Sequence, residues 1–67
     1  MKDFYIITVG GRHGYEFGVH ARFTDEFGVI SLAEEYFDSP HDADSATARK
    51  MDEKDYGRLR DEIIYIE

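Results

Sequence analysis

The first apolar segment of the chain, Asp3 to Val9, is rich in β-branched and aromatic residues and therefore predicts a β-strand. Both faces of this strand are apolar, with Phe4 and Ile6 on one face and Tyr5, Ile7 and Val9 on the other. A strand that is apolar on both faces is usually central in its sheet. We therefore expect this strand to have a neighbour on each side.

A second segment, Tyr15 to Phe23, alternates strictly between apolar and polar residues. This alternation predicts an antiparallel strand with one buried and one exposed face. The glycine-rich sequence between the two segments, Gly10 to Gly14, predicts a hairpin loop, because glycine readily adopts positive φ. Gly18, on the polar face of the second strand, marks a bulge or a place where another part of the chain approaches closely.

After Thr24 the apolar residues recur at the spacing of a helix. They form one face of an amphipathic helix: Val29, Leu32, Ala33, Tyr36 and Phe37. Thr24 is the preferred N-cap, since Gly28 inside a helix costs only about 1 kcal/mol. A start at Ser31, with Glu34 completing a capping box, remains open. Pro40 is expected to end the helix.

The last part of the chain predicts a polar loop, a short helix and a closing strand. His41 to Ser45 is the loop, and the residues from 45 to 51 fit either a helix or a short edge strand over Thr47 to Met51. Asp52 is placed to cap a helix from Glu53 to about Arg60, with Gly57 weakening it. Glu62 to Glu67 predicts a strand that is apolar on both faces.

These elements predict one compact domain, residues 1–67, of the α+β class. We expect a small hairpin-based sheet, antiparallel or mixed, with helices packed on one face in the order ββα(β)αβ. A chain of 67 residues without cysteine has a thin core and no disulfides to support it. Since helices on one face would leave the other uncovered, we expect a second copy of the chain or a partner protein to cover it.

The charge of the chain is concentrated in its middle. The formal net charge is −7, and residues 25–48 alone sum to −7, because they contain no Lys or Arg. Such a block repels nucleic acid and anionic membranes and attracts basic surfaces. We call these seven carboxylates the acidic block: Asp25, Glu26, Glu34, Glu35, Asp38, Asp42 and Asp44. They are the candidate partner-binding residues.

Other site chemistries are poorly supported. Arg12 and His13 in the glycine-rich loop are weak candidates for anion binding, because phosphate loops normally lead into a helix and this loop leads into a strand. The histidines match no zinc spacing, and the start of a calcium-loop pattern at Asp42 fails where Ala46 and Thr47 replace a ligand and the required glycine. No metal site is predicted.

Catalysis and nucleic-acid binding are also disfavoured. No nucleophile, base and acid stand in a recognised arrangement, and no cofactor motif is present, so we expect a protein without enzymatic activity or cofactor. Aromatic and basic residues on the hairpin, among them Tyr5, Tyr15 and Arg22, are compatible with a nucleic-acid stacking surface, but the net charge opposes direct nucleic-acid binding.

The leading hypothesis is a small acidic protein-binding module that occupies the basic surface of another protein. In size and charge the chain resembles the small phage-encoded inhibitors that occupy nucleic-acid-handling or defence proteins, a resemblance of type that no residue motif carries. The alternative is a structural or accessory homodimeric subunit whose acidic face is only solubilising. Without a signal peptide or a membrane span in the sequence, a cytoplasmic location is expected.

Overall fold

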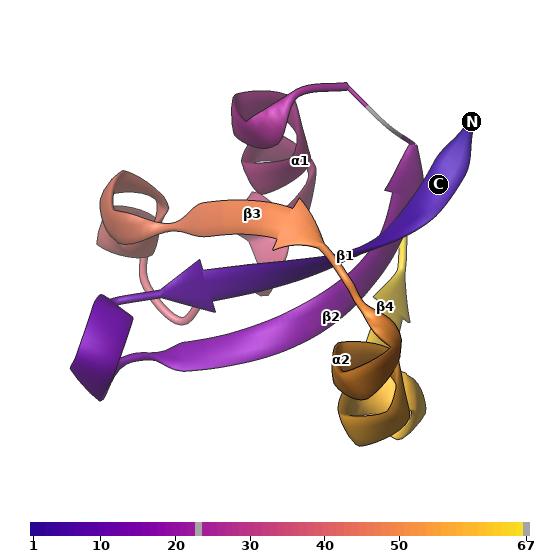
Figure 1. Ribbon diagram of the computed structural model, residues 1–67. Helices are drawn as coiled ribbons and strands as arrows, with labels where there is room; N and C mark the ends of the chain where they lie inside the picture. Colours follow the sequence, from indigo (N-terminus) through magenta and orange to yellow (C-terminus); the bar gives the residue numbers. More distant parts are fainter. Residues whose placement is uncertain (23, 67) are drawn as a thin grey trace.

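The computed structural model describes residues 1–22 and 24–66, apart from the side chain of Arg12. The described residues form a four-stranded sheet in the order β3-β1-β2-β4 (Figure 1). β1 (Lys2–Val9) pairs antiparallel with β2 (Tyr15–Arg22) and with β3 (Thr47–Lys50), whereas β4 (Ile63–Tyr65) runs parallel to β2. The predicted α+β class, hairpin-based mixed sheet and element order are confirmed, and β1 has a neighbour on each side.

The hairpin closes as the glycines predicted. Gly10 and Gly11 have φ values of 73° and 58°, which residues with a Cβ rarely adopt, and they lead into the 3₁₀ turn η1 (Gly11–His13). The strand register runs from Val9 opposite Tyr15 to Lys2 opposite Arg22. The predicted end of this strand at Phe23 lies outside the described residues.

The main core lies between one face of the sheet and α1 (Glu26–Ala33). The helix buries Val29, Ile30 and Ala33. They pack on the side chains that the odd positions of the hairpin present to this face: Tyr5, Ile7, Val9 and Val19. Leu32, predicted to face inward, is half-buried, and Ile30 takes a core position that the predicted spacing did not include.

The helix boundaries differ from the prediction. Asp25, and not Thr24, is the N-cap, because its Oδ1 accepts the N–H of Gly28 at 2.7 Å. Gly28 lies inside the helix as predicted.

The helix also ends earlier than Pro40. It changes after Ala33 into the 3₁₀ turn η2 (Glu34–Tyr36), and a further 3₁₀ segment, η3 (Pro40–Ser45), replaces the predicted loop. The tighter 3₁₀ turn changes the angle between successive side chains, which leaves Tyr36 40 % exposed instead of inward-facing.

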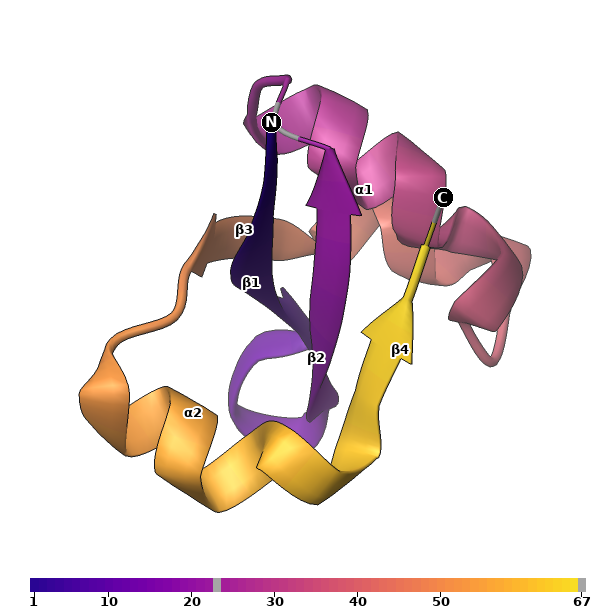
Figure 2. The same ribbon diagram turned by 90° about the vertical axis from the view of Figure 1, so that its right-hand side faces the viewer.

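The second helix, α2 (Glu53–Leu59), covers the other face of the sheet. Asp52 caps it as predicted, and its Oδ1 accepts the N–H of Asp55 at 2.8 Å. α1 lies in the upper part of both views and α2 in the lower part, with the hairpin between them (Figures 1 and 2). The expectation of helices on one face is therefore wrong in this respect.

Gly18 leaves room for the side chains that cover the second face, above all for Met51, which precedes α2. Gly18 pairs with Ile6, and a Cβ at Gly18 would lie 2.3 Å from Cε of Met51 and 3.8 Å from Cβ of Leu59. The predicted close approach at Gly18 is thus confirmed. With the glycine allowing this approach, Ile6 is fully buried within the chain itself. The second face of the sheet, which we expected a second copy of the chain or a partner protein to cover, is covered at this point by the chain itself.

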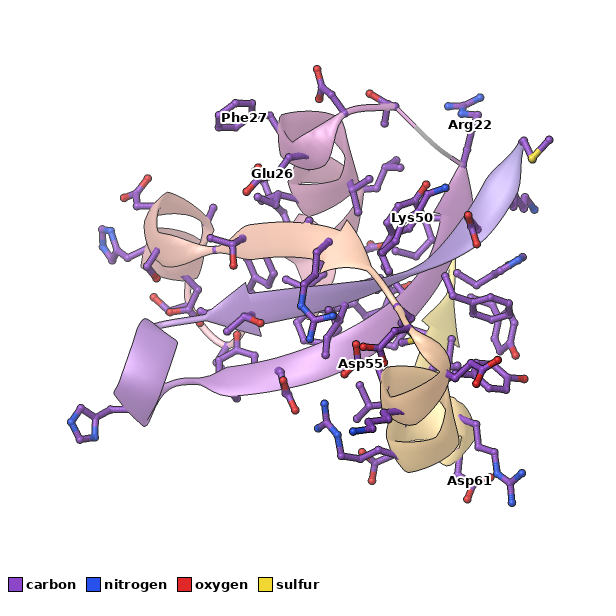
Figure 3. All side chains as sticks on the ribbon, in the orientation of Figure 1. Arg22, Glu26, Phe27, Lys50, Asp55 and Asp61 are labelled. Atoms are coloured by element: carbon purple, nitrogen blue, oxygen red, sulfur yellow. The ribbon has the colours of Figure 1, made fainter. Side chains whose placement is uncertain are left out.

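An ion-pair cluster joins α2 to the sheet. Asp55, only 6 % exposed, points from α2 toward the strands (Figure 3). Its Oδ1 accepts hydrogen bonds from Nη2 of Arg49 on β3 at 3.3 Å and from Nη2 of Arg58 at 3.1 Å, and Arg58 also pairs with Glu16 on β2. The Arg49 hydrogen bond, more than any other contact, holds the pKa of the Asp55 carboxyl well below its usual range.

The two helical glycines predict opposite effects of alanine. At Gly57 a Cβ would meet no other atom within 4 Å, so Gly57→Ala should raise the free energy of unfolding by about 0.5–1 kcal/mol. At Gly28 a Cβ would lie 2.2 Å from Oγ1 and 2.9 Å from Cβ of Thr24, so Gly28→Ala should destabilise the protein. Urea unfolding of both variants measures the difference, and equal stabilisation by both would contradict the packing at Thr24.

Replacing Asp55 should cost stability in a pH-dependent way. Asp55→Asn removes the negative charge that two guanidinium groups share and replaces one of its two acceptor oxygens by a donor, so we expect the midpoint of thermal unfolding at pH 7 to fall by roughly 8 °C or more. Because the pKa of Asp55 is lower in the folded state, its contribution is present above about pH 4 and is lost as the pH falls further. Thermal melts at pH 7 and about pH 2.5 should show the gap between the variants narrowing, whereas the exposed Asp61→Asn should leave the midpoint nearly unchanged.

Candidate functional site

The structure divides the acidic block into three groups. Three carboxylates, Glu34, Glu35 and Asp38, line one groove. Two others have a role in local structure, since Asp25 caps α1 and Asp42, in η3, accepts hydrogen bonds from the Tyr15 hydroxyl and from the N–H of Ser39. The remaining two, Glu26 at the start of α1 and Asp44 in η3, are exposed and do not line the groove. The proposed binding role of all seven stays a prediction.

The groove is formed by the end of α1, the chain that follows it as far as Pro40, and Ile66 near the C-terminus. Its volume is about 740 Å³. The polar part of its lining consists of Glu34, Glu35, Asp38 and two serines, Ser31 and Ser39. The rest is apolar: Leu32, Phe37, Pro40 and Ile66. We call this site the acidic groove, because carboxylates and apolar side chains share one concave surface.

Tyr15 attaches the part of the acidic groove that contains Asp38 to the sheet. Its hydroxyl donates a hydrogen bond to Oδ2 of Asp42 at 2.8 Å and accepts one from the backbone N–H of Asp38 at 3.0 Å. Partial burial of the ring is the main cause that raises the pKa of Tyr15, and the neighbouring Asp42 carboxylate adds to it. The phenol therefore stays protonated at neutral pH and keeps both bonds.

Asp42 completes this attachment from the loop side. Its Oδ2 also accepts the backbone N–H of Ser39 at 3.3 Å, and the Ser39 hydroxyl accepts the N–H of His41 at 3.2 Å. This capping box begins η3, whose first residue, Pro40, also lines the groove. The segment that carries Asp38 and Pro40 is therefore held at both ends by hydrogen bonds.

The carboxylates of the acidic groove form no ion pair with the described part of the chain. Neither α1 nor η2 carries a basic residue in its last turn. The ion pairs of the described residues all lie elsewhere: Arg49–Asp55, Arg58–Asp55, Arg58–Glu16 and Lys50–Asp3. The negative charge at the groove is therefore open to a partner.

The position of these carboxylates on the helix is electrostatically unfavourable. Glu34 and Glu35 follow the last residue of α1, where the unpaired carbonyl groups make the negative end of the helix dipole. Cations are favoured at this end, and carboxylates there cost about 0.3–1 kcal/mol each at low ionic strength. A cation bound at the groove would relieve both the dipole and the mutual repulsion.

The other predicted site features are not brought together. His13 is exposed in η1, and the side chain of Arg12 lies outside the described residues, so the anion-binding loop stays a prediction. Within residues 1–22 and 24–66, no group of His, Asp and Glu side chains is arranged to hold a metal ion.

Sequence reasoning missed the residues that build the groove. Phe37 was assigned to the core and Ile66 to the closing strand, and both also line the groove. The alternation predicts Tyr15 on the apolar face of β2 and gives it no role at the groove. The signal that it had a further role was its hydroxyl, since a tyrosine that is partly buried normally finds a hydrogen-bond partner.

Sequence reasoning also missed Phe27. This residue is 78 % exposed in the first turn of α1, and it projects away from the sheet next to Glu26 (Figure 3). The core face of the helix is already filled by Val29, Ile30 and Ala33. Phe27 therefore contributes little to packing within the chain.

Comparison of the chain with protein-family models, with curated proteins and with solved structures gave no match. In the part of the chain that the structure describes, no helix is long and apolar enough to cross a membrane. The chemistry of the surface must therefore carry the functional argument.

Removing the Tyr15 hydroxyl tests how the groove is held. Tyr15→Phe keeps the ring, which stacks on Phe17 with centroids 6.1 Å apart, but loses both hydrogen bonds. We expect the amide of Asp38 to exchange with solvent about five-fold faster, the effect of losing one hydrogen bond of about 1 kcal/mol. Hydrogen exchange followed by NMR measures this, with Tyr36→Phe as the control. An unchanged Asp38 amide would show that the tyrosine does not hold the segment.

Proposed function

We propose that the protein is a small, non-enzymatic binding module that occupies the basic surface of another protein through the acidic groove. The observation that carries the proposal is the set of groove carboxylates, which form no ion pair among the described residues, beside an apolar concave surface. Glu34 and Glu35, at the negative end of α1, lower the stability of the chain that carries them, and a basic partner would offset this cost. A merely solubilising charge would not need this position.

Phe27 supports the same proposal from the other end of the helix. Positions 27 and 31 fall on one side of α1, so Phe27 shares the outer face of the helix with Ser31 of the groove. Large exposed aromatic residues often supply the binding energy of an interface, and surrounding charges steer the encounter and set its specificity. Phe27 would be the apolar anchor, about 10 Å along the helix from the carboxylates.

This arrangement suits an inhibitor of the phage-encoded kind, which needs no active site of its own. Such a protein acts by occupying a surface that normally binds a negatively charged ligand. The acidic groove presents carboxylates in place of phosphates, and the net charge of −7 favours fast association with a basic surface. A cytoplasmic location is part of this proposal.

A second candidate function, a homodimeric accessory subunit, is supported by a row of aromatic rings on the face of the sheet opposite α1. Four rings follow one another there, with centroids 5.2 Å apart for Tyr56 and Phe4, 4.5 Å for Phe4 and His20, and 5.3 Å for His20 and Tyr65. Tyr65, on the edge strand β4, is 65 % exposed. In this alternative two copies of the chain contact each other through the aromatic row. Light scattering during size-exclusion chromatography would then show a dimer, and the variant Tyr65→Ser would be a monomer.

The proposed function predicts a partner whose binding depends on salt and on three particular carboxylates. Affinity purification from the native host at low salt, with identification by mass spectrometry, provides the partner. Its dissociation constant should rise at least tenfold between about 50 and 300 mM salt, since exposed charges are screened over this range. The variant Glu34→Gln/Glu35→Gln/Asp38→Asn should weaken binding at least tenfold at low salt and slightly raise the unfolding midpoint.

A matched control carries the same change in net charge elsewhere. Glu53→Gln/Asp61→Asn/Glu62→Gln alters three exposed carboxylates of α2 and the turn after it, and Asp61 lies on the side of the molecule away from α1 (Figure 3). We expect this control to keep most of the affinity. Equal losses of affinity in the two triple variants would show that the groove carboxylates act only through the net charge of the protein. Binding that neither salt nor the groove variant changes would reject the proposal.

A further inference from the structure

The lining of the acidic groove combines two chemistries that few ligands match together. Its carboxylates attract a cation, while Leu32, Phe37, Pro40 and Ile66 offer an apolar floor to whatever carries that cation. A hydrated inorganic ion would gain nothing from this floor. The occupant must therefore carry positive charge on an apolar body, as the long basic side chains do.

Phe37 narrows the choice between the two long basic side chains. Its ring is half-buried and meets Phe17 edge to face, at 71° and a centroid distance of 6.0 Å, and it also contributes to the groove. A guanidinium group is planar and weakly hydrated and stacks on aromatic rings, whereas an ammonium group is compact and strongly hydrated. A guanidinium group thus loses less on entering a groove with an aromatic and apolar floor.

The carboxylates favour the same choice. Glu34 and Glu35 lie in one turn, η2, and Asp38 follows this turn, and none has a basic partner among the described residues. A guanidinium group has five N–H donors in a fixed plane, and it can donate to more than one carboxylate at once. The two serines of the lining, Ser31 and Ser39, add hydroxyl oxygens at the same surface.

The size of the groove agrees with a side chain that enters together with some of its backbone. About 740 Å³ lies within the range of roughly 300–1,000 Å³ that is typical of small-molecule sites. The hydrogen bonds of Tyr15 and Asp42 hold the part of the groove that contains Asp38 in place before any ligand arrives. A preformed groove costs less to occupy than one that must be ordered on binding.

We propose that the acidic groove binds an arginine side chain of the partner protein, with the aliphatic stem on the apolar floor and the guanidinium among Glu34, Glu35 and Asp38. This inference rests on the proposed function and names the chemistry that the groove selects. It predicts that the groove distinguishes arginine from lysine, which general electrostatic attraction does not.

Three short peptides test it without knowledge of the partner: acetyl-Gly-Arg-Gly-amide, its lysine analogue and its citrulline analogue. Citrulline keeps the shape of arginine without its charge. In NMR titrations at low salt, we expect the arginine peptide to produce saturable shifts at Ser31, Leu32 and Ile66 and to bind at least five-fold more tightly than the lysine peptide. The citrulline peptide should produce no saturable shift at these residues.

Two variants separate the contributions of charge and ring. Glu35→Gln, at an exposed position, should weaken the arginine peptide at least three-fold. Phe37→Leu, whose folding is checked by its amide spectrum, should reduce the preference for arginine over lysine toward equality.

Equal binding of the arginine and lysine peptides by the wild-type protein, or no saturable shift at the groove with either, would overturn the inference. The salt-dependent binding of a whole partner would then still stand or fall on its own experiment. Loss of that binding together with a retained arginine preference would instead reject the proposed function and leave the groove as a site for arginine.

Discussion

Strand β1 carries buried side chains on both of its faces, and the need to cover both within 67 residues determines where the other elements lie. On one face, α1 covers Tyr5 and Ile7 with three buried residues. On the other face the cover is the two-turn helix α2 together with Met51, whose side chain occupies the space that a side chain at Gly18 would need. Asp55 attaches this short helix to β3 through Arg49, and Arg58 attaches it to β2 through Glu16. The thin second layer is thus held by a polar cluster as well as by apolar contacts.

The acidic groove is the place where the chain departs from its own local rules. The N-terminal ends of both α-helices follow the usual preferences, with Asp25 and Asp52 as caps and carboxylates in the first turns. At the end of α1 the same residue type recurs with the opposite electrostatic effect. In natural proteins such local conflicts are expected at functional sites. This contrast within one chain makes the groove a better candidate than the other acidic positions.

Much of the fold was predictable from periodicity, because strands and caps have local causes. The alternation from Tyr15 predicted β2, and Asp52 predicted the start of α2. The failures came from contacts between distant residues. Nothing near Gly18 in the sequence indicates that Leu59 packs against it, so the closure of the second face was missed. At the site, the charge of residues 34, 35 and 38 was predictable from the sequence. The apolar part of the groove was not, because it combines Leu32 with Ile66, which is far away in the sequence.

The contribution of Ile66 to the groove connects the site with the folding of the whole chain. Ile66 follows β4, which is only three residues long and pairs with β2, a strand from the first third of the chain. Contacts between residues this far apart in sequence require closing a large loop, which costs chain entropy. The groove is therefore complete only when the native topology is complete. A ligand in the groove would select molecules with β4 in place, and partly folded chains would be poor competitors for the partner.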